Sequence, residues 1–331
     1  MPSSIPRCGM GESSPLDASR PGPGVSRGPR SGPAGSRAVR RFAKHRMAVG
    51  GAALLAVVGL TAISAPVSAP FRYDRQDLFA TYHAPTHAHW AGTDALGRDV
   101  LSRLMYGARV SMSVGVATAA LVLAMGVPVG LTAGYFGGTF DLLLMRVVDI
   151  VFAIPFLLLV VLLQTFFTAY LPTIRHGPLV WLRVLNHDTG GVTAIVMALA
   201  LVGWLDVARV ARGQVLSLRH REFVLAAKSL GAVDRHVMGI HLLPNIAAPI
   251  IVMATLLIPG FIIAEAGLSF LGLGVQPPVP SWGTMIAEGI DSIESYPRLV
   301  IAPGLALAAT LLSLNFVGDG LRDALDPAGE R

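Results

Sequence analysis

Six long apolar stretches with few charges constrain the fold of this chain more than any other feature of its sequence. The first, Met47 to Pro66, has 20 residues and no charged side chain. As an α-helix it would be about 30 Å long, the thickness of the hydrocarbon core of a bilayer. Five further candidate spans follow at about 110–134, 144–170, 191–209, 246–264 and 299–317. The pattern predicts an all-α, polytopic membrane protein with six transmembrane helices.

The composition excludes several other classes of protein. Hydrophobic residues make up 53% of the chain and charged residues only 14%, against roughly 25% charged residues in soluble domains. The apolar residues are gathered in runs, which argues against a soluble enzyme. The net charge of +6 comes from charges beside these runs, with no basic face interleaved with aromatics, so we expect no nucleic-acid partner. Because Cys8 is the single cysteine, an intrachain disulfide framework and a cysteine-rich metal site are excluded.

Prolines lie inside several of the candidate spans. Neighbouring helices or Ser and Thr side chains can satisfy the carbonyl groups that a proline leaves without a hydrogen-bond donor in a membrane. We therefore expect kinks in continuous helices at four positions: Pro128, Pro155, Pro259 and Pro303.

The chain divides into four segments by composition. Pro, Gly, Ser and Arg dominate the first 36 residues, which predicts a disordered tail. A cleaved signal peptide is the alternative for the first apolar run, but that run starts far into the chain and is longer than a usual signal core. The predicted segments are the tail, the first transmembrane helix with an extracytoplasmic loop, a five-helix core and a cytoplasmic C-terminal tail, at 1–36, 37–109, 110–317 and 318–331.

Lysine and arginine predict the orientation in the membrane. With the N-terminus inside, fourteen of the Lys and Arg residues counted from position 27 fall in inside segments and eight in outside loops. The positive-inside rule then places both termini in the cytoplasm.

The inside loop 210–245 is polar but contains a helical series, Phe223, Ala226, Ala227 and Leu230, whose spacing places these residues on one face. Gly231 is expected to break this helix, Asp234 to cap a second short one, and Pro244 to end it. Such a helix can dock in the groove of a partner or lie on the lipid surface, and the residues alone leave both open.

The same loop resembles a known motif. The run from Glu222 to Gly231, followed by His241 to Asn245, is similar to the EAA loop of ABC importer permeases, with Leu225 and His241 where the family has Glu and Ile. In that family the loop is the coupling helix that sits in a cleft of the ATPase subunit. The resemblance assigns this role to Glu222, Phe223, Ala226, Ala227, Leu230, Gly231, Leu243 and Pro244.

Two further segments resemble the C-type subunits of the dipeptide, oligopeptide and nickel importer family. They are a signature before the second span and a loop before the sixth, containing Gly92, Thr93, Asp94, Gly97, Arg98, Asp99, Ser102 and Arg103, and Pro277, Pro278, Trp282 and Gly283. We interpret these residues as structural. The resemblance implies the ABC type I importer permease fold in the cell membrane. It also implies a second, B-type permease, two ATP-binding subunits and an extracytoplasmic solute-binding protein, with peptides as the solute and nickel or another small solute as the alternative.

Charged pairs at helical spacing are interpreted as structural ion pairs. Asp94 and Arg98, and Asp99 and Arg103, are four residues apart. Arg146 with Asp149 and Asp206 with Arg209 are three apart near the predicted inner ends of spans, where we expect interhelix or intersubunit pairs.

Three histidines, His83, His87 and His89, are close in the sequence and could ligate a metal. Because no cysteine lies nearby, we interpret them as a chance cluster and predict no metal site.

The sequence favours a transport subunit over an enzyme. It contains no Gly-x4-Gly-Lys-Ser/Thr phosphate loop, so we expect no cofactor on this chain, and ATP with Mg²⁺ on partner subunits. A stand-alone secondary transporter would show midplane ionisable residues and an internal repeat, and a membrane enzyme a catalytic constellation at the mouth of a span. Neither pattern is evident.

Overall fold

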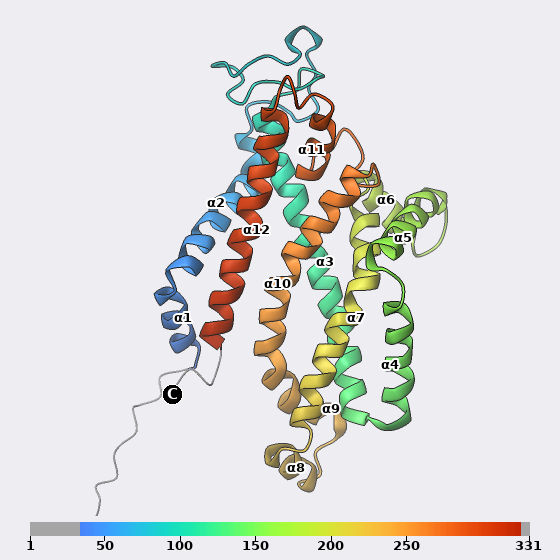
Figure 1. The fold of residues 1–331 in the computed structure, drawn as a ribbon. Coiled ribbons are helices and arrows are strands. Elements are labelled where there is room, and N and C mark those ends of the chain that lie inside the picture. Colours follow the sequence, from blue (N-terminus) through green and yellow to red (C-terminus); the bar gives the residue numbers. More distant parts are fainter. Residues whose placement is uncertain (1–33, 326–331) are drawn as a thin grey trace, which may run out of the picture.

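The computed structural model describes residues 34–325, which are almost entirely helical (Figure 1). Six of their helices are long and apolar enough to cross a membrane, so the predicted six-helix architecture is confirmed. These spans are α2 (Arg46–Ser68), α3 (Val100–Phe136), Phe156–Thr173, α7 (Val192–Leu218), Asp234–Phe270 and α12 (Arg298–Leu325). The third comprises α5 (Phe156–Tyr170) and the short helix η2 (Leu171–Thr173); the fifth comprises α9 (Asp234–His236), η3 (Val237–Leu242) and α10 (Leu243–Phe270).

Helices α3 and α7 pack against each other along most of their length and form the centre of the bundle (Figure 1). Small residues allow this close approach: a Cβ added to Gly126 would lie 2.7 Å from the carbonyl oxygen of Trp204. Val122, Leu199 and Phe261 belong to the main apolar cluster, which α5 and α10 complete. The remaining helices, α2 and α12, pack together on one side.

The predicted span 144–170 is wrong as a single helix. The chain turns at Gly137, where φ is +65°, directly into α4 (Gly138–Phe152), and α5 begins only at Phe156. Pro155 precedes it in an extended conformation, because proline lacks the N–H that would continue the α4 hydrogen-bond ladder. The prolines expected in the other spans do lie within continuous helices, at Pro128, Pro259 and Pro303.

The shorter elements gather at the two ends of the bundle (Figure 1). One end carries the segment 69–99 with η1 (Leu78–Ala80), together with α6 (Val180–Asp188) and α11 (Trp282–Ile290). The other end carries α1 (Ala34–Lys44) and α8 (Glu222–Ser229). Because α1 begins at Ala34, the last residues of the predicted tail 1–36 are helical, and residues 1–33 lie outside the described residues.

Candidate functional site

Helix α8, at the end of the bundle opposite α11, has two different faces. Val224 is fully buried and Ala227 is 9% exposed, and Val224 belongs to an apolar cluster with residues of α7 and η3. Phe223, Ala226 and Leu230 are exposed. The prediction of one face shared by all four residues is therefore wrong for Ala227, which packs against the bundle.

The turn after α8 forms at Gly231, as predicted. Its φ is +82°, a conformation that residues with a Cβ resist. Its N–H donates to the Lys228 carbonyl at 3.0 Å, and the next N–H, of Ala232, donates to the Ala227 carbonyl at 3.0 Å. A Cβ at Gly231 would meet no atom within 4 Å, so the requirement for glycine here is one of backbone conformation.

Asp234 is not the predicted N-cap. Val233 holds that position and Asp234 is the first residue of α9. The Asp234 carboxylate instead accepts a hydrogen bond of 2.5 Å from the Tyr135 hydroxyl on α3. The Lys228 ammonium lies 4.4 Å from the centre of the same Tyr135 ring, so one aromatic side chain ties both arms of the turn to the bundle.

Pro244 does not end the second helix, which corrects another prediction. The N–H of Leu243 donates to the Met238 carbonyl five residues back, at the end of the π-helical η3. Pro244, lacking an N–H, then sits in the first turn of α10, where proline is tolerated. Leu243 and Pro244 thus begin α10, within the fifth span, while Glu222 lies exposed in the first turn of α8.

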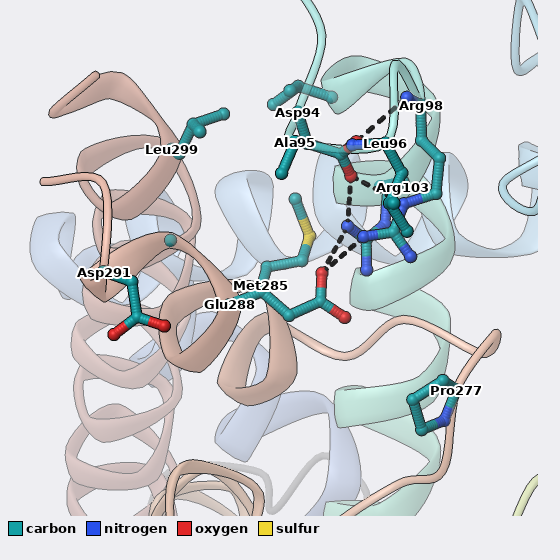
Figure 2. Close-up of a pocket in the computed structure, with 12 residues that line it drawn as sticks. Asp94, Ala95, Leu96, Arg98, Arg103, Pro277, Met285, Glu288, Asp291 and Leu299 are labelled. Atoms are coloured by element: carbon teal, nitrogen blue, oxygen red, sulfur yellow. Dashed lines mark hydrogen bonds and ion pairs between the residues drawn. The ribbon is translucent and has the colours of Figure 1, made fainter. Parts of the chain in front are cut away.

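A cluster of charges, buried except for Glu288, lies at the opposite end (Figure 2). Arg98 Nε donates to Asp94 Oδ2 at 2.7 Å, which confirms the predicted pair. Arg103 Nη1 also binds Asp94 Oδ2, at 2.6 Å. Glu288 Oε2, from α11, accepts from both arginines at 2.7 Å (Figure 2).

The predicted pair of Asp99 and Arg103 is wrong. Asp99 is the N-cap of α3, and its Oδ2 accepts from the backbone N–H and the hydroxyl of Ser102, both at 2.7 Å. Its other carboxylate oxygen lies 2.9 Å from Nδ1 of His89. The Asp99 carboxylate caps α3 and therefore does not pair with Arg103, the partner that the sequence spacing predicts.

Glycines in the signature allow the segment 69–99 to fold against itself. Gly92 and Gly97 have φ values of +76° and +69°. A Cβ on Gly97 would overlap the backbone of Asp77. The Thr93 hydroxyl donates to the Ala80 carbonyl and accepts from the N–H of His83. These contacts support the structural interpretation of the signature.

Trp282 and Gly283 join α11 to the bundle. The Trp282 indole N–H donates to the Leu104 carbonyl at 3.2 Å, and its backbone N–H points to the Ser111 hydroxyl at 3.3 Å. A Cβ on Gly283 would lie 2.5 Å from the Cα of Ala266. Both residues are therefore packing positions.

Pro277 lines two cavities that open at this end. The smaller, of about 370 Å³, adjoins the charge cluster. The larger, of about 860 Å³, is bordered by Pro278 and by side chains of α5 and α6.

Glu265 was not predicted from the sequence. It is fully buried in α10; its Oε1 accepts from the Ser269 hydroxyl at 2.7 Å, and its Oε2 from the Ser111 hydroxyl at 3.1 Å. A single carboxylate close to the end of a long apolar run is the signal that could have identified it.

The three histidines do not form a group that could hold a metal ion in the described part of the chain. His89 binds Asp99 and stacks on the Phe71 ring with centroids 4.7 Å apart. Within residues 34–325, no group of three or more His, Cys, Asp or Glu side chains gathers as a metal site would require.

The charges of α4 and α7 pair between helices and not along them. Arg209 Nη2 donates to Asp149 Oδ1 at 3.1 Å, and Arg212 Nη2 donates to Asp141 Oδ2 at 2.6 Å. Among the described residues, Arg146 forms no salt bridge with Asp149 and Asp206 forms none with Arg209; Asp149 and Arg209 pair with each other across the two helices. The expectation of interhelix pairing in this region is correct, with different partners.

Two family models match separate parts of the chain. Residues 126–330 match the family described as binding-protein-dependent transport system inner membrane component. Residues 34–85 match the N-terminal TM domain of oligopeptide transport permease C.

Individual relatives share about two residues in five with this chain. The oligopeptide transport system permease protein OppC of Bacillus subtilis (strain 168) is 39% identical over 290 residues, 88% of each chain. The dipeptide transport system permease protein DppC of the same organism is 40% identical, over 87% of this chain and 84% of its own. OppC of Escherichia coli (strain K12) is 39% identical, over 87% of this chain and 89% of its own.

Proposed function

This chain belongs to the binding-protein-dependent transport system inner membrane component family, among the oligopeptide and dipeptide permeases, and on that premise we propose that it forms half of a peptide pathway in an ATP-driven importer. It is a multi-pass membrane protein. In the proposed assembly it carries no catalytic site. A second permease completes the pathway, two ATP-binding subunits supply the energy and an extracytoplasmic protein delivers the solute.

The observation that carries the proposal is the exposed α8 at one end of the six-helix bundle (Figure 1). Phe223, Ala226 and Leu230 form an apolar stripe on a short helix outside the membrane spans, and Leu230 is 89% exposed. An apolar stripe of this kind fits a groove in a protein partner. The opposite face, with Val224 buried against the bundle, would carry the motion of that partner to α7 and α10.

The proposal assigns ATP to other subunits of the importer. The sequence of this chain lacks the phosphate-binding loop with an invariant lysine. An ATP-driven function therefore requires separate subunits, and α8 is the surface we assign to them.

The exposed surface of the bundle supports a second permease. The apolar side chains of α4 and α5 are largely exposed, among them Leu143, Ile150, Leu158 and Leu162. A homologous permease packed around a pseudo-two-fold axis would enclose a pathway that six helices alone do not enclose.

The test is reconstitution with the candidate partners encoded in the same genome. Proteoliposomes are prepared with both permeases and the ATPases, and the binding protein is added. They should accumulate a radiolabelled di- or oligopeptide only when ATP is present on the side of the membrane that carries the ATPases. Omitting this chain should abolish both the uptake and the peptide-stimulated ATP hydrolysis. Uptake that persists without this chain, or without ATP, would contradict the proposal.

A further inference from the structure

Four ionisable side chains of α4 and α7 are exposed on the surface of the bundle: Arg146, Asp149, Asp206 and Arg209. Arg146 and Asp149 are on α4, and Asp206 and Arg209 are on α7. Both helices contribute to the half of the bundle nearer α8 (Figure 1).

These charges lie at membrane depth. Asp206 is 14 residues after Val192 and 12 before Leu218, or about 21 Å and 18 Å from the two ends of α7. Arg209 is 9 residues from Leu218, or about 14 Å. A bilayer core is about 30 Å thick and α7, with 27 residues, is about 39 Å long, so a core that falls within α7 holds Asp206 at least about 9 Å from either of its edges.

The geometry leaves the charges only partly neutralised. Arg209 binds Asp149 at 3.1 Å, yet the two side chains are 48% and 59% exposed, and the guanidinium lies 4.2 Å from the Phe152 ring. Asp206 has no ion pair within 4 Å in the described part of the chain. By contrast, the neighbouring Arg212–Asp141 pair is 30% and 12% exposed.

Exposed charges of both signs do not face lipid tails, because hydrocarbon offers them no hydrogen bonds. They must face either a partner protein or water. A protein partner would need an opposite charge for Asp206, another for Arg146, and further polar groups for the exposed Arg209–Asp149 pair. Water needs no such match, and the surface beside α4 is where the proposed second permease would enclose a pathway.

We propose that Arg146, Asp149, Asp206 and Arg209 line the inner half of the solute pathway, as a water-filled segment with both signs of charge. This inference rests on the proposed function. A free peptide carries an ammonium and a carboxylate group, and the segment offers an oppositely charged group for each. Contacts that several exposed charges share are weak enough to let a solute leave, which transport requires.

Cysteine accessibility tests the proposal in the assembled transporter. Cys8 is replaced by Ser and one cysteine is placed at position 206, where no ion pair is lost. The matched control is Val57→Cys, on an apolar and 56% exposed position of α2, 11 residues from each end of its helix. Inside-out vesicles are treated with a charged methanethiosulfonate, and modification of this chain is followed by mass.

Asp206→Cys should react at least tenfold faster than Val57→Cys, with or without ATP, and saturating dipeptide should slow the reaction several-fold. Equally slow reaction of both, in every nucleotide state, would show that a partner seals the charges and would overturn the proposal. If Asp206→Cys does not reach the membrane, Arg146→Cys replaces it. Its control is then Leu54→Cys, which lies 8 residues from the start of its helix, as Arg146 does.

Uptake by the cysteine-free parent separates this proposal from the proposed function. If the parent accumulates peptide but Asp206→Cys is unreactive, the charged lining is wrong and the importer assignment stands. If Asp206→Cys reacts rapidly but no peptide is accumulated, the lining stands and the solute class is wrong.

Discussion

At the scale of single residues, the end of the bundle that carries α11 depends on Asp94, which binds two buried arginines. Asp94, Arg98 and Arg103 are 8%, 5% and 2% exposed. Asp94→Ala would leave both guanidinium groups with Glu288 alone. Removing one partner from a buried ion pair costs about 3–5 kcal/mol, so we expect the free energy of unfolding to fall by about that amount, measured by denaturant titration of the purified permease.

The control is Asp74→Ala. Asp74 binds Arg72 at 3.0 Å, but Arg72 is 79% exposed, so water replaces the lost contact and the stability should change little. If both substitutions lowered the free energy of unfolding by a similar amount, burial would not be the reason that the Asp94 ion pairs stabilise the fold.

Gly97 gives a second residue-scale prediction, since a Cβ there would overlap the backbone of Asp77. Gly138 is the matched control, because its φ of +60° is similar and a Cβ would meet nothing within 4 Å. Both Gly→Ala changes cost about 1 kcal/mol in backbone conformation. Only Gly97→Ala should lose substantially more, seen as a larger drop in melting temperature. Equal drops in melting temperature would mean that the segment 69–99 shifts to accommodate the added methyl group.

Sequence spacing predicted the partner of Arg98 but not that of Arg103. The rule of four residues finds contacts along one helix turn. It cannot find Glu288, which lies 185 residues away in the sequence from Arg103. It also could not show that Asp99 precedes the helix and caps it. Contacts set by tertiary packing were therefore beyond the sequence argument.

At the scale of elements, the exposed face of α8 makes a prediction for Ala226, whose neighbour Ala227 lies on the buried face. Ala226 is exposed and Ala227 is buried. Ala226→Arg should leave the permease in the membrane at normal level, while co-purification of the proposed ATPases and peptide uptake both fall at least fivefold. The reason is steric, because a groove that accepts alanine has no room for arginine.

Leu225→Glu is the control for an added charge on α8. Leu225 is 49% exposed on the other flank of α8, and glutamate is the residue that the family pattern has there. ATPase binding and uptake should be retained. Full binding by Ala226→Arg would contradict the assignment of α8 to the ATPases and favour a helix that lies on lipid.

The turn at Gly231 makes a separate prediction, because its φ of +82° is tolerated by Asn but not by β-branched residues. Gly231→Val should displace α8 from α9 and reduce uptake strongly, while Gly231→Asn should retain most of it. Both variants should reach the membrane, since no atom lies within 4 Å of the new Cβ. Equal uptake by the two would show that the conformation of this turn does not matter for coupling.

Two prolines show why hydropathy alone does not predict where a helix begins or ends. Pro128 and Pro155 lie in equally apolar surroundings, yet α3 continues through Pro128 and the chain breaks at Pro155. Pro128 lies between Gly126 and Gly130, both of which pack closely against α7, so the surrounding contacts hold the helix together. Hydropathy predicted that a span exists near 144–170, but the break at Pro155 leaves only Phe156–Thr173 as a candidate span.

At the scale of the whole molecule, the number of spans followed from the sequence because each depends only on its own length and composition. The arrangement of the spans did not, since it depends on which faces pack. The close approach of α3 and α7 at Gly126 and Gly130 joins segments that no local pattern relates.

The last prediction concerns the orientation of the bundle. The described ends of the chain meet at the end that also carries α8: His45, just before α2, lies 3.8 Å from Asp323 near the end of α12. Basic residues gather at this end, among them Arg40, Arg41, Lys44, Arg219, Arg221, Lys228 and Arg235. The positive-inside rule therefore predicts a cytoplasmic location for this end. Green fluorescent protein fused after Glu330 should fluoresce, whereas alkaline phosphatase fused there should be inactive. Fusions after Gly177, between η2 and α6 at the other end, should give the reverse result. An active phosphatase after Glu330 would invert the molecule and place α8 out of reach of any ATPase in the cytoplasm.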